Sequence, residues 1–500
     1  MLEPKVVQLT AGSAVLGLVL AAGAVTLAGP WDSGQRTAER AVAAAQARTG
    51  GAHHQAAGPG RPGVPAPAPS APGVLTTLGD TAAKAAAPPP GALAAVLDPL
   101  LAAPGLGPLR TASVIDVATG KQLYGNGAAA PMTPASTIKI ATSVAALTAL
   151  GPDHRIPTTV VATPDARRLT LVGGGDPTLD TARLRALAAD TARALRGRGV
   201  TSVRLAYDTS RYAGPGRHPI GVNDNIAPVT ALMTNEGRLD GSTSGPAPRS
   251  ADPAGDTARA FADLLTRQGV ATEAAPAPAR APEKATMLAR TWSQPLSALV
   301  EHTLTHSDND LAEALARQTA LASGRPASFQ GAGRAVADRL RELGLPVKGA
   351  RFADGSGLDR HDRLSATMLT GLLARAADPA RPELRPVLTG LPVGGFTGTL
   401  KDRYADGSPG AGLIRAKTGT LSGVNALAGT VVTADGRLLA FAFLADRTSS
   451  PHTAQPALEQ QETPRAVRVL GRPRLVAGLP ENRRLLVAER RRHRHAPQRP

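Results

Sequence analysis

The sequence predicts an α+β fold in which helices precede an antiparallel sheet. Residues 293–324 carry apolar side chains at helical spacing on both sides of one polar segment. Residues 413–446 instead read as three consecutive strands, and Asp435-Gly436 forms the hairpin turn before the last of them. Helices followed by an antiparallel meander are typical of α+β layering.

Composition limits the classes of protein that the chain can belong to. Its 500 residues are 42% hydrophobic but only 2% aromatic, so the core must be aliphatic, and the length fits two or three units plus tails. The absence of cysteine excludes disulfides, thiol catalysis and cysteine-bound metal. The net charge is +17, of which residues 451–500, with 11 Arg and 4 Glu, carry 11 − 4 = +7. Because no nucleic-acid module is recognisable, we expect no nucleic-acid partner.

The N-terminal residues predict export. Residues 1–29 contain no charge after Lys5, and their apolar run is long enough to be either a membrane anchor or a cleaved signal peptide. Both alternatives make the protein extracytoplasmic, either membrane-anchored or secreted. Residues 30–90 are rich in Pro and Ala, a composition that predicts an extended linker.

Residues 91–156 are expected to form the first part of a folded domain. The order is a helix near 92–101, a hairpin turning at 118–120, and a helix beginning near Ser136. Gly151-Pro152 ends that last helix. Ser136 and Lys139 are three residues apart at the start of the helix, so their side chains share a face.

Residues 157–285 are predicted to be an inserted, smaller domain, and residues 286–450 complete the first one. The inserted part mixes strand-type segments with two helices. Its glycine run at 173–175 lacks the following Gly-Lys-Ser/Thr of a phosphate-binding loop, so we interpret it as a turn. Residues 451–500 are Arg- and Pro-rich and predict a basic, disordered tail.

Three short motifs follow one another in the chain: Ser136-Thr137-Ile138-Lys139, Ser307-Asp308-Asn309 and Lys417-Thr418-Gly419. Each is weak alone, but together and in this order they are the signature of serine enzymes that react with β-lactams. Lysine is rare here, since the chain has 8 lysines against 48 arginines and two of the eight lie in these motifs. A buried lysine can lose its proton near neutral pH, whereas arginine cannot.

The motifs therefore predict a catalytic serine and its helpers. Ser136 is the nucleophile, Lys139 its base, and Ser307 carries a proton to the leaving amine. Substrate binding falls to Asn309, Lys417, Thr418, Gly419 and Thr420, with Lys417 also lowering the Lys139 pKa by repulsion. The backbone N–H groups of Ser136 and Thr420 are the candidate oxyanion donors.

The chain resembles the D-alanyl-D-alanine carboxypeptidase/endopeptidase family, peptidase family S13, of class C low-molecular-weight penicillin-binding proteins. The resemblance spans roughly residues 92–446 and includes PASTIKIATSVAALTALGPD, LVGGGDPTL, ADGSGLDRHDRLSATML and IRAKTGTLSGVNALAGTV. It implies a penicillin-binding-protein/β-lactamase-like fold, with an antiparallel sheet flanked by helices beside a helical subdomain. The separation of Ser136 and Ser307, 307 − 136 = 171 residues, is longer than a β-lactamase needs and accommodates the inserted domain.

The resemblance implies a serine D-Ala-D-Ala carboxypeptidase or endopeptidase acting on peptidoglycan stem peptides through an acyl-enzyme on Ser136, without a cofactor and inhibited by β-lactam antibiotics. Two alternatives stay open: a β-lactamase, and a catalytically weak wall-binding or penicillin-sensing protein. The tail matches nothing in the family. It is either a basic segment that binds anionic cell-wall polymer or the product of a shifted reading frame, and in the second case one sheet face would lack its covering helix.

Three further features have both a functional and a purely structural interpretation. His302 and His306 have the spacing of zinc ligands, but no third ligand follows in sequence, so we predict no metal site. Asp354-Gly355-Ser356-Gly357 is interpreted first as a structural loop near the site and second as a substrate contact. Glu313 is expected to be structural, and Asn235-Glu236 to border the cleft.

Overall fold

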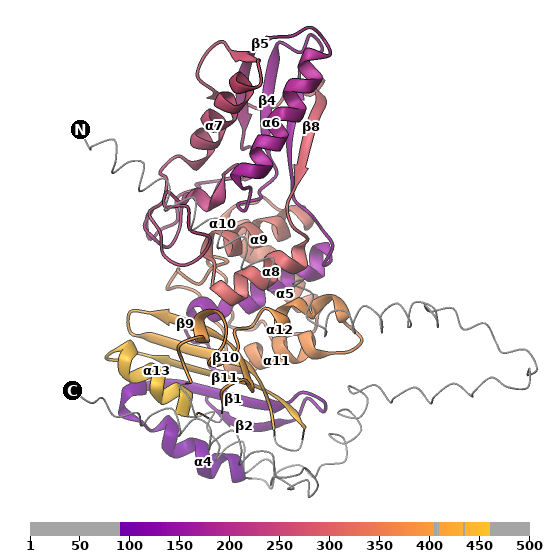
Figure 1. The fold of residues 1–500 in the computed structure, drawn as a ribbon. Coiled ribbons are helices and arrows are strands. Elements are labelled where there is room, and N and C mark those ends of the chain that lie inside the picture. Colours follow the sequence, from indigo (N-terminus) through magenta and orange to yellow (C-terminus); the bar gives the residue numbers. More distant parts are fainter. Residues whose placement is uncertain (1–90, 405–407, 409, 434–435, 461–500) are drawn as a thin grey trace, which may run out of the picture. The chain divides into compact units, whose positions relative to one another are not determined.

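The computed structural model describes residues 91–404, 408, 410–433 and 436–460 (Figure 1). The predicted anchor or signal peptide, the linker at 30–90 and residues 461–500 lie outside the described residues. Among the residues that are described, no helix combines the length and apolarity needed to cross a membrane.

The main sheet has five antiparallel strands in the order β2-β1-β11-β10-β9. The hairpin predicted near 118–120 and the meander of three C-terminal strands are both confirmed. Gly120 takes φ 68° in the first turn, a left-handed conformation that glycine adopts without steric cost. The strands are β1 (Leu109–Asp116), β2 (Gln122–Asn126), β9 (Ile414–Leu421), β10 (Val424–Val432) and β11 (Leu438–Asp446).

Alternate residues of the sheet face two different cores. Ile115, Ala440 and Ala442 pack with the helices α5 and α11, whereas Val114 and Phe441 pack with α4. The sheet is therefore buried on both faces, as the α+β prediction requires (Figure 1). The bounds of the covering elements are α4 (Ala92–Leu101), η1 (Pro104–Leu106), α11 (Ala366–Ala377) and α13 (Pro451–Gln460).

Helix α13 corrects the expectation of a tail beginning at residue 451. Ala454, Ala457 and Leu458 are buried at spacing i, i+3, i+4, and Leu458 joins the α4 side of the sheet core. The prediction averaged composition over fifty residues, whereas all eleven arginines of that segment follow Gln460. The sheet face that was expected to lack a covering helix is thus covered by α4 together with α13.

A helical subdomain packs beside the sheet and supplies two of the three motifs. Its largest core cluster joins apolar residues of α5, α8, α9 and α10. Ser136 lies in the short helix η2 that leads directly into α5, and Ser307 lies in the short connection between α8 and α9. The bounds are η2 (Ala135–Thr137), α5 (Ile138–Leu150), α8 (Leu296–His306), α9 (Asn309–Ala322), α10 (Phe329–Glu342), η4 (Pro382–Leu384), α12 (Pro386–Thr389) and η5 (Gly398–Leu400).

The inserted part forms a second, mixed sheet with its own core. Strand β8 pairs with β3, so this sheet extends to Trp292, beyond the boundary expected at residue 285. A long connection between β5 and α7, residues 209–252, is not part of the sheet and reaches the site. The bounds are β3 (Pro157–Ala162), β4 (Arg168–Gly173), α6 (Thr181–Arg196), β5 (Ser202–Asp208), η3 (Asn235–Gly237), α7 (Pro253–Arg267), β6 (Ala271–Thr272), β7 (Ala277–Pro278) and β8 (Thr286–Trp292).

Candidate active site

Ser136 and Lys139 stand on one face at the start of α5, as their spacing predicts. Lys139 Nζ lies 2.9 Å from Ser136 Oγ. The lysine is fully buried, whereas Ser136 lines an open cavity. Ala135, the residue before the serine, has φ 46°, a left-handed conformation that is uncommon for a residue other than glycine.

The partners of the Lys139 amine fix the direction of its lone pair. Besides Ser136 Oγ, Nζ donates to Asn309 Oδ1 over 2.7 Å and to the Ser356 carbonyl oxygen over 2.6 Å. These last two oxygens can only accept hydrogen bonds, whereas a serine hydroxyl can also donate. When the amine loses one proton, the two remaining N–H groups stay on the acceptors and the lone pair faces the Ser136 hydroxyl.

Burial makes that deprotonation accessible. Removal of the ammonium group from water lowers the pKa of Lys139 to about 8, and the nearby carboxylates of Asp354 and Asp308 oppose this shift. The desolvation effect is larger than the attraction to the acids. At neutral pH a substantial minority of the molecules therefore carry a neutral amine next to Ser136.

Ser307 meets a second buried lysine. Lys417, on β9, donates to Ser307 Oγ over 2.9 Å and to the Thr418 carbonyl oxygen over 2.8 Å. Ser307 ends α8 with φ 59° and ψ 36°, a strained conformation that turns the chain sharply into α9. The site therefore contains two serine–lysine pairs: Ser136 with Lys139 within the helical subdomain, and Ser307 with Lys417 between that subdomain and the sheet.

Burial is the main influence on the pKa of both lysines of the site. Burial is the main cause that lowers the pKa of Lys139, and burial likewise holds the pKa of Lys417 well below its usual range. Repulsion between the two lysines acts on Lys417, where it adds to the desolvation. A nearby anion, such as a substrate carboxylate, therefore favours the protonated form of Lys417.

Strand β9 approaches the nucleophile closely at Gly419. A Cβ atom on this residue would lie 2.6 Å from the Pro134 carbonyl oxygen and 3.2 Å from the Ser136 nitrogen. Glycine is required here because backbone packs on backbone. β9 is an edge strand of its sheet, so its outer backbone groups face the site.

The two threonines of the third motif differ in their hydrogen bonds. Thr418 is 9% exposed and donates its hydroxyl proton to Thr399 Oγ1 over 2.9 Å. Thr420 is exposed, and its hydroxyl accepts from Gln455 of α13 over 3.4 Å. The proton of Thr420 therefore points to no acceptor among these contacts, whereas that of Thr418 is engaged.

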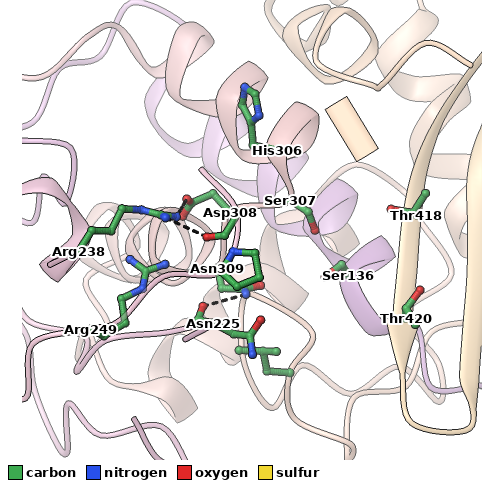
Figure 2. Close-up of a pocket in the computed structure, with 13 residues that line it drawn as sticks. Ser136, Asn225, Arg238, Arg249, His306, Ser307, Asp308, Asn309, Thr418 and Thr420 are labelled. Atoms are coloured by element: carbon green, nitrogen blue, oxygen red, sulfur yellow. Dashed lines mark hydrogen bonds and ion pairs between the residues drawn. The ribbon is translucent and has the colours of Figure 1, made fainter. Parts of the chain in front are cut away.

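A cavity of about 230 Å³ joins the motifs (Figure 2). Of the residues predicted from sequence, Ser136, Ser307, Asn309, Thr418 and Thr420 line it. Lys139 and Lys417 are buried behind the serines, and Gly419 contributes backbone beside Ser136. The structure thus brings all eight predicted site residues to one place.

Other cavity residues were not predicted. They are Asn225, Arg238, Gly245, Pro246 and Arg249 from the inserted part, with His306, Asp308 and Leu358. Arginine is the default surface cation of this chain, so nothing in the sequence distinguished two buried ones. Only Asn235-Glu236, expected to border the cleft, pointed to this region. Of the two, Glu236 lies buried next to Arg238 and Asp308.

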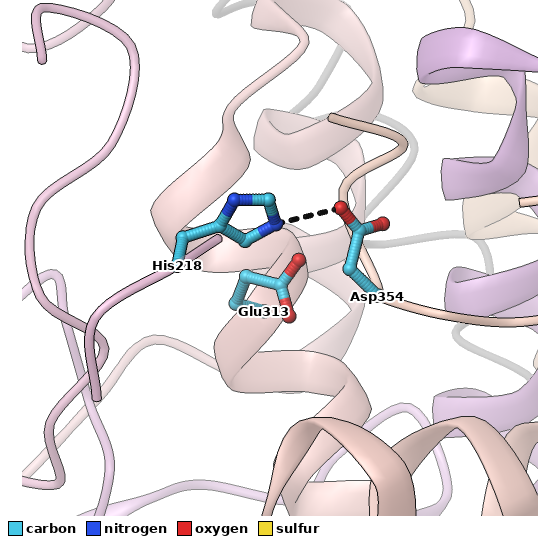
Figure 3. A group of neighbouring side chains, drawn as sticks. All are labelled: His218, Glu313 and Asp354. Carbon is cyan, nitrogen blue, oxygen red and sulfur yellow. Dashed lines mark hydrogen bonds and ion pairs between the residues drawn. The ribbon is translucent and has the colours of Figure 1, made fainter. Parts of the chain in front are cut away.

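The loop at 354–357 supports Lys139, and its Asp354 side chain lies beside His218 and Glu313 (Figure 3). Glu313 Oε1 accepts from the N–H groups of Gly355 and Ser356, each over 2.9 Å, so its role is structural as expected. Asp354 accepts from Ser356 Oγ over 3.1 Å and lies 2.9 Å from His218 Nε2. Ile220 N–H donates to His218 Nδ1, so the ring proton lies on Nε2 and faces Asp354. This loop presents the Ser356 carbonyl to Lys139.

In the structure, His302 has two potential ligand neighbours that its spacing from His306 did not indicate. His302 lies with Glu236 and Asp308 in a group whose potential ligand atoms are within 4.8 Å of one another, so further candidate ligands come from distant positions in the chain. Arg238 contacts both carboxylates, at 2.8 Å and 3.6 Å. Because a guanidinium already balances these acids, the group is better described as an ion-pair network.

Comparison with known proteins agrees with the geometry. The model of the D-Ala-D-Ala carboxypeptidase 3 (S13) family matches residues 93–247 and 239–464. The chain belongs to the S13 family. Carboxypeptidase DacB of Mycolicibacterium smegmatis is 39% identical over 423 residues, which are 81% of this chain and 90% of that protein. Carboxypeptidase Rv3627c of Mycobacterium tuberculosis is 37% identical over 400 residues, 76% of this chain and 86% of that protein.

The S13 fold is also recognised among solved structures. Penicillin-binding protein 4 (dacB) of Haemophilus influenzae superposes with a TM-score of 0.62 at 23% identity, covering 73% of this chain and 97% of that chain. The predicted penicillin-binding-protein fold is thereby confirmed. Membership of the S13 family makes the chain a serine-type D-Ala-D-Ala carboxypeptidase.

Proposed function

We propose that this chain cleaves the terminal D-Ala–D-Ala bond of peptidoglycan stem peptides by forming an acyl-enzyme on Ser136. The observation that carries the residue assignment is the Lys139 amine, whose lone pair faces Ser136 Oγ when the other two N–H groups stay on their acceptors. A serine hydroxyl is a weak nucleophile, and an adjacent neutral amine supplies the base that it lacks.

Acylation follows from these contacts. Lys139 takes the Ser136 proton as Oγ bonds to the carbonyl carbon of the penultimate D-alanine. The resulting oxyanion is held by the backbone N–H groups of Ser136 and Thr420, where β9 passes close to η2. Asn309, whose Oδ1 is fixed by Lys139, keeps its amide N–H groups for neighbouring carbonyls, of which Asn225 provides one and the substrate another.

Release of the first product uses the second serine–lysine pair. Ser307 Oγ gives its proton to the leaving D-alanine nitrogen as the C–N bond breaks, and Lys417, which donates to that oxygen, replaces it. The substrate carboxylate binds next to Lys417 and Thr420 and stabilises the protonated form of Lys417. As D-alanine leaves, Lys139 gives its proton to solvent and Lys417 takes one up, so both lysines return to their starting states. The neutral Lys139 then takes a proton from the water that attacks the ester and returns it to Ser136 Oγ as the acyl C–O bond breaks.

The same chemistry defines the partners and the place of action. A β-lactam carries a reactive carbonyl and a carboxylate in a similar arrangement, so it acylates Ser136 and blocks turnover. Peptidoglycan lies outside the cytoplasmic membrane, and the enzyme acts there. The apolar segment at residues 6–28 provides export, as an anchor or a cleaved signal, and the arginines that follow Gln460 favour contact with anionic wall polymer.

Release of D-alanine from a synthetic pentapeptide stem tests the proposal. The purified protein should liberate one D-alanine per peptide, and Ser136→Ala should release none. Retention of turnover by Ser136→Ala would contradict the assignment of the nucleophile. Rapid turnover of penicillin with no peptide cleavage would indicate a β-lactamase instead.

A further inference from the structure

The three residues that follow Ser307 are all held by one segment of the inserted part. The Asn225 carbonyl accepts from Asn309 Nδ2 over 3.0 Å, and the Ala227 N–H donates to Asp310 Oδ1 over 2.9 Å. Two ion pairs add to these contacts: Arg238 with Asp308 at 3.6 Å, and Arg249 with Asp310 at 3.2 Å. Figure 2 shows two of these contacts, Asn309 with Asn225 and Arg238 with Asp308. Only the first of the four enters the reaction proposed above.

The charged members of this group are almost completely buried. The exposed fraction of the side chain is 2% for Arg238 and Arg249 and 1% for Asp308 and Asp310. Arg238 Nε also donates to Glu236 Oε2 over 2.8 Å, and Arg249 donates to the Glu236 carbonyl oxygen over 2.8 Å. Buried ion pairs contribute little net stability but are costly to break singly, so they fix geometry.

The backbone on both sides of the contact is strained. Ser307 has φ 59°, and opposite it Asn235 and Glu236 have φ 49° and 54°. Non-glycine residues remain in this region only when their surroundings determine the conformation. Two strained turns, one in the second motif and one in the inserted segment, therefore meet across the same ion pairs.

We propose that residues 225–249 of the inserted part form a positioning clamp for the second motif, which holds Asn309 and Ser307 in the orientation that acylation of Ser136 requires. Arg238 and Arg249 are paired with the carboxylates of Asp308 and Asp310. The clamp therefore acts on the reaction indirectly, by positioning Asn309 and Ser307. It rests on the proposed acyl-enzyme chemistry and extends it: the inserted domain becomes a working part of the catalytic site.

The route from the clamp to the chemistry is short. Asn309 Oδ1 accepts from Lys139 Nζ over 2.7 Å, and the other end of the same amide donates to Asn225. A shift of the α9 start moves this oxygen and removes an acceptor that stabilises the ammonium form of Lys139. The pKa of Lys139 then falls further, and the two N–H groups that aim its lone pair lose one of their partners.

The test compares two charge-neutral double variants. Arg249→Met with Asp310→Asn removes the clamp ion pair but keeps an oxygen for the Ala227 N–H. Arg437→Met with Asp116→Asn is the matched control, because this pair, at 2.6 Å with exposed fractions of 9% and 1%, lies beyond the end of β10 and does not line the cavity. The measurement is the second-order rate constant of acylation by a fluorescent penicillin, as a function of pH.

We expect the clamp variant to acylate at least tenfold more slowly, with the midpoint of its pH profile below that of the wild type. The control should stay within twofold, with an unchanged midpoint. Should the double clamp variant not fold, Arg249→Lys carries the test and is expected to slow acylation at least threefold. Clamp variants that match the wild type in both rate and midpoint overturn this proposal, whereas a wild type that is never acylated overturns the proposed function instead.

Discussion

Lys417 Nζ donates a hydrogen bond to Ser307 Oγ over 2.9 Å, so the second serine of the site has a buried lysine of its own. The distance equals that between Lys139 and Ser136. The two pairs differ in their remaining contacts, because only Lys139 has two further acceptors that aim its lone pair at the serine. This difference supports the proposal that the first pair activates the nucleophile and the second delivers the proton.

Removal of the Ser307 hydroxyl should therefore impair catalysis without removing the nucleophile. We expect Ser307→Ala to release D-alanine from a pentapeptide about 100-fold more slowly, within the range typical of a lost proton donor. Labelling by penicillin should remain detectable, since Ser136 and Lys139 are intact. A variant that cleaves the peptide within twofold of the wild-type rate would refute the proton-delivery role.

The pKa of Lys139, about 8, sets the pH dependence of acylation. With the neutral amine as the proposed base, the acylation rate should rise about tenfold per pH unit below the pKa and level off above it. The rate of acylation by a fluorescent penicillin, followed from about pH 6 to about pH 10, measures this rise and its plateau.

Lys139→Arg provides the matching control, because arginine keeps the positive charge but does not deprotonate. We expect its acylation to be at least about 100-fold slower at every pH in that range. A flat wild-type profile, or an arginine variant that acylates normally, would mean that another group is the base.

The two motif threonines should separate in their effect on substrate binding. Thr420→Val removes the hydroxyl that is proposed to bind the substrate carboxylate. Such a charge-assisted bond is worth about 1.5–3 kcal/mol, so KM for the peptide should rise about tenfold or more. Thr418→Val removes a hydroxyl that donates to Thr399 and should change KM less than about threefold. Equal effects of the two substitutions would argue against Thr420 as the carboxylate ligand.

Helix α13 should decide which C-terminal truncations are tolerated. Truncation after Gln460 keeps the helix and should preserve folding and D-alanine release. Leu458→Ala in the full chain opens a buried site on the sheet and should lower the free energy of unfolding by about 2–5 kcal/mol. Urea denaturation measures the free energy of unfolding of the truncated chain and of Leu458→Ala, and a D-alanine assay measures the activity of the truncated chain. A truncation after Gln460 that loses activity together with wall retention would instead support the weak, wall-binding alternative.

The sequence predicted those parts of the site whose residue types are rare or whose spacing is regular. Ser136 and Lys139 could be paired because three residues make nearly one helical turn, and because lysine is uncommon in this chain. The two β-type runs on either side of residues 118–120 likewise predicted a hairpin, which the pairing of β1 with β2 confirms.

Contacts between segments that are distant in the chain could not be predicted from residue type or spacing. The Ser356 carbonyl that orients Lys139 is a backbone group, and any residue type could provide it. Arg238 and Arg249 belong to the commonest cationic type of the chain, and only the packing of the inserted segment on α9 gives them acids to bind. The helix at 451–460 was hidden by the composition of the residues that follow it.

Mass spectrometry of the intact protein after incubation with benzylpenicillin tests the central claim most directly. Activation of Ser136 by Lys139 predicts an increase by the mass of one penicillin, located on the peptide that contains Ser136 and absent from Ser136→Ala. A folded wild type that stays unlabelled, or a label that persists in Ser136→Ala, would contradict it.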